Sequence, residues 1–288
     1  MSNYRQRFIE DMDLHGYSKR TVAMYSRAVR QLEDHFNKPA EKVTEEEIRH
    51  YFLYNKTDRN WSRAASTIAL CGIKFFFEKT LQKEWQVFDL VRPKRETKLP
   101  VILSRKEVLA IFSKVKMPYH RACLEGIYSL GLRLQEGTNL KIADIDSDRM
   151  FVHIHRGKGN KDRFVPLPKR TLEIFRENWK THRNPEYLFP APGRGQIHMP
   201  TAKKPVPYAS IQTAFHRALK KTKILKKASV HNLRHSYAVH LLESGVSMRY
   251  VQEYLGHNDP RTTMIYLKLI NIELQEPIKL INKVMATL

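Results

Sequence analysis

Apolar side chains recur every three or four positions through most of the first ninety residues, a spacing typical of amphipathic helices. The pattern predicts one helix from Tyr4 to Leu14, closed by Gly16. A second helix is expected to begin after Ser18, whose hydroxyl can cap it, and to end before Pro39. Both helices present an apolar stripe that needs a partner to cover it.

Two more helices complete this region. Thr44 and Glu47 form a capping box, which predicts the start of a third helix. A fourth is expected from about Ser62 and includes the run Phe75–Phe77. Four helices in this length predict a compact helical bundle over residues 1–90.

Residues 91–100 interrupt the pattern. This segment holds two prolines and four basic residues and has no apolar period, so it predicts an interdomain linker. Its charge allows two interpretations, a contact along a polyanion or a solvated tether.

The remainder predicts a second, mixed domain over residues 101–270. A capping box at Ser104 begins a helix, and further helices are expected near residues 121–130, 172–179, 210, 230 and 247. Alternating β-formers at Met150–His155 and Arg163–Leu167 flank a glycine-bearing turn, which predicts a hairpin. The proline-rich stretch Ala191–Pro207 is expected to be an exposed loop. The fold class is therefore mainly α (α+β), with a small antiparallel sheet.

Charge separates the two parts of the chain. The 288 residues carry 51 Lys and Arg against 29 Asp and Glu, a formal net charge of +22. Residues 1–100 hold 19 basic and 14 acidic side chains, whereas the rest hold 32 and 15. So basic a protein is expected to bind a polyanion, most commonly nucleic acid, mainly through its second domain.

Other features exclude several classes of protein. No run of about 18 apolar residues is present, so no membrane partner is expected. The first residues lack the apolar stretch of a signal peptide, which predicts a cytoplasmic protein. Cys71 and Cys123 are too few for a disulfide framework or a thiolate metal site.

Candidate chemistry lies in polar residues at the edges of apolar segments of the second domain. These are Arg133, Glu136, Lys158, His231, Arg234, His257 and Tyr266. Taken singly, each has an ordinary structural explanation, such as an intrahelical ion pair, a solvated turn, a helix cap or a core aromatic.

Together these residues suit phosphodiester chemistry. Two arginines can hold the oxygens of one phosphate, and a tyrosine hydroxyl can attack it to form a covalent ester. A lysine can protonate the leaving oxygen, and histidines can donate hydrogen bonds or accept a proton. The sequence has no carboxylate cluster for a metal, so no metal and no cofactor are expected.

The order of the motifs resembles the tyrosine site-specific recombinases, the phage integrase family. His231–Gly245, Val251–Asn258 and Thr262–Tyr266 are similar to the family's C-terminal signature. Gly131–Glu136 resembles its first arginine box, and Gly157–Arg163 its β-hairpin lysine. The match spans residues 101–270 and is closest to Xer-type and integron-integrase-like members. The N-terminal bundle resembles the core-binding, SAM-like domain more loosely.

The resemblance implies a role for each position. Arg133 and Arg234 would hold the scissile phosphate, which Tyr266 would attack to leave a 3′-phosphotyrosine. Lys158 would be the general acid for the 5′-hydroxyl.

The remaining three residues would assist. The resemblance implies that His231 aids proton transfer and that His257 donates a hydrogen bond to the phosphate. Glu136 would be a structural support and would not react.

The resemblance also implies partners and a biological role. The expected partner is double-stranded DNA with paired inverted half-sites, bound by a dimer per site and a homo-tetramer through a Holliday junction. The expected function is integration, excision or transposition of a mobile element. Alternatives are Xer-like dimer resolution of chromosomes or plasmids, a type IB topoisomerase, and a non-catalytic DNA-binding regulator. Residues 271–288 predict a tail helix, which packs on its own domain or docks in a neighbouring protomer.

Overall fold

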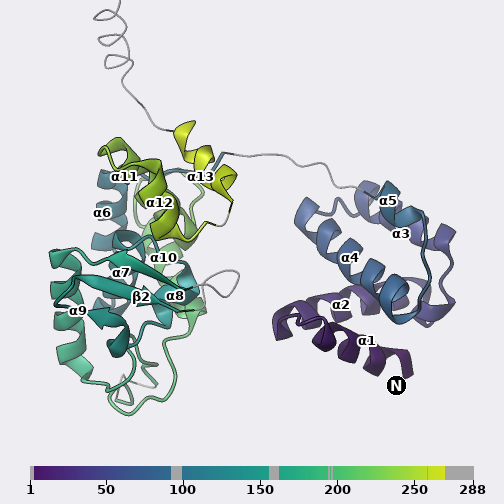
Figure 1. The fold of residues 1–288 in the computed structure, drawn as a ribbon, viewed down its shortest axis with the longest axis horizontal. Helices are drawn as coiled ribbons and strands as arrows, with labels where there is room; N and C mark the ends of the chain where they lie inside the picture. Colours follow the sequence, from purple (N-terminus) through teal and green to yellow (C-terminus); the bar gives the residue numbers. More distant parts are fainter. Residues whose placement is uncertain are drawn as a thin grey trace, which may run out of the picture. The chain divides into compact units, whose positions relative to one another are not determined.

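The chain divides into two compact units, Met1–Thr97 and Lys98–Leu288, drawn in Figure 1. This computed structural model describes residues 3–91, 99–155, 162–193, 195, 197–257 and 259–269. Most of the predicted linker, the turn that carries Lys158 and the predicted tail helix lie outside the described residues. Among the helices of the described ranges, none combines the length and apolar content that crossing a membrane requires.

The first unit is helical. Its elements are α1 (Asn3–Leu14), α2 (Lys19–Phe36), the 3₁₀ turn η1 (Ala40–Lys42), α3 (Glu45–Thr57), α4 (Arg63–Phe75), the π-helical turn η2 (Phe76–Thr80) and α5 (Val87–Leu90). The predicted caps at Ser18 and Thr44 are confirmed, because both hydroxyls accept a backbone N–H of the following helix. The Ser62 hydroxyl caps α4 in the same way, although no cap was predicted there. The short α5 was not predicted.

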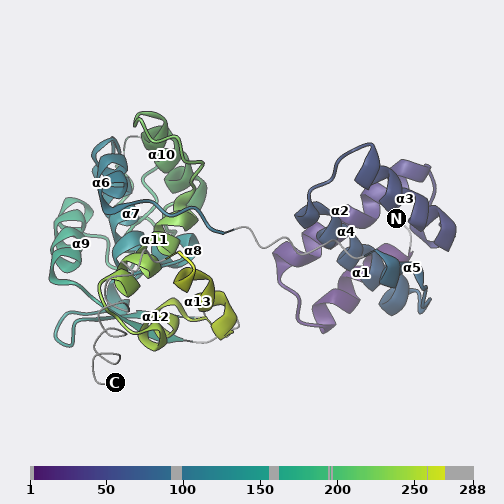
Figure 2. The ribbon, with the colours of Figure 1, turned by 90° about the horizontal axis from the view of Figure 1, so that it is seen from above.

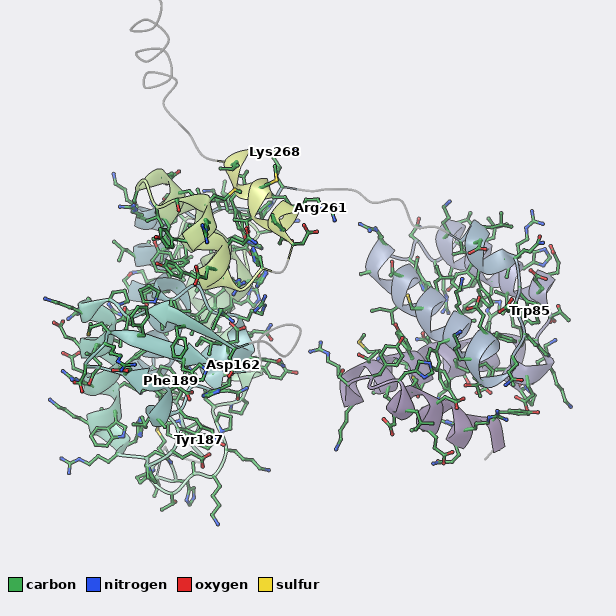
Figure 3. The ribbon with its side chains drawn as sticks, in the orientation of Figure 1. Trp85, Asp162, Tyr187, Phe189, Arg261 and Lys268 are labelled. Carbon is green, nitrogen blue, oxygen red and sulfur yellow. The ribbon has the colours of Figure 1, made fainter. Side chains whose placement is uncertain are left out.

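The run Phe75–Phe77 explains the π-helical turn at the end of α4. Phe76 and Phe77 are both buried, although consecutive residues of a regular α-helix point about 100° apart. The wider turn faces both rings inward: Phe76 meets Phe8 of α1 edge-on at 5.2 Å, and Phe77 stacks on Trp85 at 4.5 Å. Trp85 is labelled in Figure 3. These aromatic rings form the centre of the first core.

The second unit is mainly helical around a three-stranded sheet. Its helices are α6 (Arg105–Ser113), α7 (Pro118–Ser129), α8 (Leu134–Thr138), the 3₁₀ turn η3 (Ile142–Asp144), α9 (Lys169–His182), α10 (Tyr208–Lys220), α11 (Val230–Glu243), α12 (Met248–Leu255) and α13 (Pro260–Leu267). Its strands are β1 (Ile145–Asp146), β2 (Phe151–Ile154) and β3 (Arg163–Pro166), antiparallel in that order. The mainly α fold class and the hairpin are confirmed, and β1 is an addition.

The stretch Ala191–Pro207 differs from the exposed loop that its prolines predict. Met199 and Val206 are buried, and the side chain of Asn184 donates hydrogen bonds to the carbonyls of Met199, Pro200 and Ala202. Asn184 is itself 1% exposed. This buried amide, with a backbone hydrogen bond from Val206 to Phe189, holds the described part of this stretch against the domain.

Helices α11, α12 and α13 lie side by side at one end of the unit, as Figure 2 shows. They share a small apolar cluster that includes Val239, Val251, Leu255 and Tyr266. Helix α13 starts with Pro260 at its first position and is capped by Asp259, whose side chain accepts the Arg261 N–H. The predicted nucleophile therefore lies on a regular helix.

Gly131 provides a test of the packing between α7 and α11. Its φ of +59° is left-handed, and a Cβ there would lie 2.6 Å from Tyr237 Cε1. Gly245, in the same unit, is also left-handed at φ +86° but has nothing within 4 Å.

We expect Gly245→Ala to lower the free energy of unfolding by about 1–2 kcal/mol, for backbone strain alone. Gly131→Ala should lower it by about 1–3 kcal/mol more, for the forced overlap. Urea unfolding of both variants measures this difference. Equal losses would show that Tyr237 does not limit the space.

Candidate active site

A pocket of about 390 Å³ opens where α8, α11, α12 and α13 meet in the second unit. It is lined by Arg133, His231, Arg234, His235, Gly256, His257, Asp259, Thr262 and Tyr266. Five of the seven residues singled out from the sequence therefore share one cavity. Glu136 lies directly beneath it, in contact with Arg133.

The carboxylate of Glu136 gathers guanidinium groups around itself. It accepts a hydrogen bond from Arg133 Nη1 at 2.7 Å and one from the Arg133 backbone N–H at 2.7 Å. Arg163 donates two more, from Nη1 at 3.0 Å and from Nη2 at 2.7 Å. Burial would raise the pKa of Glu136, but the hydrogen bonds and charge of Arg163, with those of Arg133, lower it to about 2. Glu136 is therefore an anion at neutral pH.

Arg163 is a structural residue that sequence reasoning missed. It is buried at the start of β3, and its Nε also donates to the Tyr254 carbonyl at 2.8 Å. Gly256 allows this approach, since a Cβ there would lie 2.9 Å from Arg163 Cδ. The strand pattern offered a signal. Arg163 and Val165 are two positions apart, so both lie on the inward face of the strand, where a charged residue needs a buried partner.

Arg234 is the most deeply buried arginine of the described residues, at 1% exposure. Its Nη1 donates to the Gly131 carbonyl at 2.8 Å, and its Nη2 donates to the Leu255 carbonyl. Burial, followed by repulsion from Arg133, lowers its pKa to about 9, so it remains charged at pH 7. Glu136 Oε2 is 3.8 Å from Nη1.

The three guanidinium groups and one carboxylate leave a net charge of +2 beside the pocket. Because the carbonyls and Glu136 fix all three guanidinium groups by hydrogen bonds, little reorganisation is needed when an anion enters. A phosphodiester has the charge and the acceptor oxygens that such a site binds.

Three histidines complete the wall of the pocket. His231 and His235 lie on α11, and His257 follows the end of α12. Burial and the nearby positive charges lower the pKa of each one, to about 4 for His235 and about 3 for His257. His257 Nδ1 lies 2.9 Å from the Thr263 hydroxyl, and the His231 and His235 rings meet edge-on at 4.5 Å. All three imidazoles are therefore neutral at pH 7.

Tyr266 is 2% exposed and forms a hydrogen bond with His235, Oη to Nδ1 at 2.8 Å. Burial raises the pKa of the phenol, although Arg234 and Arg133 oppose the rise. His235 was not singled out from the sequence. Its position four residues after His231 places both rings on one face of α11, and this helical spacing was the available signal.

The residues that line this pocket belong to a region with known relatives. Residues 102–271 match the phage integrase family, and residues 4–87 match the N-terminal SAM-like domain of phage integrases. The chain belongs to the phage integrase family. The resemblance drawn from the motifs is thus confirmed, and so is the looser resemblance of the helical bundle to the SAM-like domain.

Individual relatives cover nearly the whole chain. A Sinorhizobium fredii protein named integrase/recombinase y4qK is 36% identical over 288 residues, which is 100% of this chain and 88% of the relative. The tyrosine recombinase XerA of Thermococcus kodakarensis is 32% identical over 282 residues, covering 96% and 95% of the two chains. The fold is also similar to a lambda integrase tetramer bound to a Holliday junction, at a TM-score of 0.73, 16% identity and coverage of 91% and 76%.

The charge of Glu136 should be required for the stability of the second unit. We expect Glu136→Gln to lower the free energy of unfolding by about 3–5 kcal/mol at pH 7, because it leaves buried guanidinium groups without their counter-charge. Glu173→Gln is the matched control, since it breaks an exposed i,i+3 pair with Arg170 and should cost under about 1 kcal/mol.

The stability that Glu136→Gln loses should depend on pH in a defined direction. The folded pKa of Glu136, about 2, lies below the ordinary 4.5, so its stabilisation is complete above pH 4.5 and disappears as pH falls towards 2. The stability difference between wild type and Glu136→Gln should therefore shrink below pH 4.5. A difference that is constant from pH 7 to 3 in denaturant titrations would contradict this assignment.

Proposed function

We propose that this chain is a site-specific DNA recombinase that cuts and rejoins strands through a 3′-phosphotyrosine. The observation that carries the proposal is the pocket in which a buried tyrosine hydroxyl faces a neutral histidine beside fixed arginines. Family membership supports the same reaction.

In the proposed reaction, Arg133 and Arg234 bind the non-bridging oxygens of the scissile phosphate and stabilise the charge that grows on them. Tyr266 Oη forms a bond to phosphorus while the bond from phosphorus to the 5′-oxygen breaks. Lys158 donates a proton to that 5′-oxygen, a role that rests on the resemblance of the sequence motif. His257 donates a hydrogen bond to the phosphate.

The proton of Tyr266 needs an acceptor, and two histidines are candidates. The resemblance assigns proton transfer to His231, whereas the hydrogen bond of Tyr266 goes to His235 Nδ1. We propose that His235 accepts this proton as Tyr266 attacks, because its Nδ1 is already within hydrogen-bond distance of the phenol oxygen. His231, packed against His235, then supports that ring.

The energy of the broken bond is conserved in the phosphotyrosine ester. The free 5′-hydroxyl of a partner strand attacks phosphorus, the bond to Tyr266 breaks, and the strand is rejoined. The reaction therefore needs no nucleotide cofactor and no external source of energy.

The proposed partner is double-stranded DNA with paired inverted half-sites. We propose that the basic second unit and the helical first unit both contact the duplex, with a dimer on each site and a tetramer through the Holliday junction. The named assembly of the structurally similar lambda integrase supports this arrangement. Residues 271–288 would dock in a neighbouring protomer, and the protein would act in the cytoplasm.

Two biological roles have support. The relatives named integrase/recombinase favour integration, excision or transposition of a mobile element. The relatives named XerA favour dimer resolution of chromosomes or plasmids. Paired inverted half-sites beside the gene would favour the first role, and half-sites at a replication-terminus locus would favour the second.

Tyr266→Phe should abolish covalent attachment to DNA while leaving DNA affinity unchanged, because only the nucleophilic oxygen is removed. Tyr250→Phe, an exposed tyrosine on the neighbouring α12, is the matched control and should retain attachment. The assay is formation of a denaturation-resistant protein–DNA adduct on a nicked site. An adduct in the Phe variant would identify another nucleophile.

His235→Asn should separate proton transfer from positioning. Asparagine can offer an oxygen near the position of Nδ1 and so retain the hydrogen bond, but it cannot take the proton. We expect adduct formation to slow by roughly 10²–10⁴-fold, the usual contribution of a general base. His235→Ala should be at least as slow.

The rate of adduct formation in variants of the two histidines, and its dependence on pH, decides which histidine accepts the proton. The loss in His235→Asn should diminish as pH rises, since hydroxide can replace the missing acceptor. A wild-type rate in His235→Asn together with a slow His231→Ala would return proton transfer to His231.

A further inference from the structure

The outer face of the hairpin gathers two imidazoles and a carboxylate. His153 and His155 are two residues apart at the end of β2, so they lie on the same face of the sheet. Because β2 pairs with β3 in a register that sets Ile154 opposite Arg163, Asp162 lies opposite His155. Figure 3 labels Asp162 at this end of the sheet. The face is separate from the pocket, since none of these residues lines it.

The spacing of the three groups matches the coordination of a metal ion. His153 Nε2 lies 3.1 Å from Asp162 Oδ2, and His155 Nδ1 lies 3.5 Å from the same oxygen. In tetrahedral zinc sites, with ligand bonds of about 2.0–2.1 Å, neighbouring ligand atoms are roughly 3.3 Å apart. One ligand atom from each residue lies within 4.8 Å of the others, so modest rotation of the imidazoles would close the set.

A buried carboxylate orients one of these imidazoles. Asp144 is 8% exposed, and its Oδ1 lies 2.9 Å from His155 Nε2, while its Oδ2 accepts the Lys141 N–H at 2.9 Å. A carboxylate at this distance can accept a hydrogen bond from His155 Nε2–H, the tautomer that keeps Nδ1 as the ligand atom on the side of Asp162.

The Asp144–His155 contact matches the outer part of the carboxylate–histidine–metal relay found around protein zinc ions, in which the outer carboxylate sets the tautomer of the ligand. Imidazole nitrogens with one carboxylate suit Zn²⁺, whereas Mg²⁺ requires a set dominated by oxygen. About half of the His155 and Asp162 side-chain surface is exposed, so an ion can enter from solvent.

We propose that His153, His155 and Asp162 bind one Zn²⁺ ion, with Asp144 as the outer carboxylate and water as the fourth ligand. The ion joins the end of β2 to the start of β3, which are the two ends of the segment that carries Lys158. It takes no part in the proposed strand cleavage and is independent of it. Its role is to cross-link the two strands of the hairpin.

The experiment titrates the full-length protein, stripped of metal, with Co²⁺ as a spectroscopic probe and then with Zn²⁺. We expect the intense visible absorption of tetrahedral Co²⁺, saturating at one ion per chain and displaced by Zn²⁺ but not by excess Mg²⁺. His153→Ala and His155→Ala should each abolish this absorption. His216→Ala, an exposed histidine on α10, is the control and should leave it unchanged.

A second variant tests the outer carboxylate. Asp144→Asn should weaken zinc affinity roughly 10–100-fold while keeping the stoichiometry. The thermal midpoint of wild type should rise with zinc concentration by mass action, and that of His155→Ala should not.

Three results would overturn the proposal. One is an absorption that persists in both histidine variants, which would place the ion elsewhere, for example on the histidines of the pocket. Another is equal competition by Mg²⁺. The third is the absence of any saturable Co²⁺ signal, which would leave His155 as an imidazolium that bridges Asp144 and Asp162.

Discussion

The candidate active site depends on one buried carboxylate. Glu136 binds Arg133 and Arg163 directly and lies near Arg234, so a single negative charge allows three guanidinium groups to gather in a space with little water. Without it, mutual repulsion and desolvation would force the arginines apart or out to solvent. The carboxylate neutralises one charge of three. What remains is a fixed positive field, built into the fold before any substrate arrives.

The same carboxylate connects elements that are distant in the sequence. Arg133 precedes α8 and Arg163 begins β3, while the Tyr254 and Leu255 carbonyls at the end of α12 accept hydrogen bonds from Arg163 and Arg234. The hairpin, α8 and the last turn of α12 therefore meet through polar contacts as well as apolar packing. The hydrogen bonds and ion pairs that position the arginine charges also stabilise the fold. A substitution that weakens these contacts therefore disturbs the site and lowers the stability together.

Local signals made much of the fold predictable. The capping boxes at Thr44 and Ser104 depend on residues three positions apart, and both form as expected. The hairpin also follows from short-range alternation. The buried Met199 and Val206 did not follow, because the contacts that hold them come from Asn184 and Phe189, which no local pattern connects to them.

The candidate active site was likewise predictable where the signal is local and unpredictable where the contacts are long-range. Motif order identified five of the nine residues that line the pocket, whereas their mutual contacts are long-range. Arg163 meets Glu136 across 27 positions, and His235 meets Tyr266 across 31, so neither pairing is visible in sequence spacing. The helix that carries Tyr266 has only eight residues, too few for a clear apolar period, although Asp259 and Pro260 mark its start.

Tyr266, the proposed nucleophile, packs in a different apolar cluster from the large core of the second unit. Tyr266 packs in a small cluster with Val251 and Leu255, while the large core of the unit is formed by other residues. Helix α13 is held to its neighbours by few polar contacts among the described residues, chiefly those of His235 and His257. Elements with little buried area open locally at a lower free energy than the whole domain unfolds. We therefore expect helix α13 to open locally while the arginine charges stay in place, so that access to the proposed nucleophile would be a local equilibrium, separate from the stability of the fold.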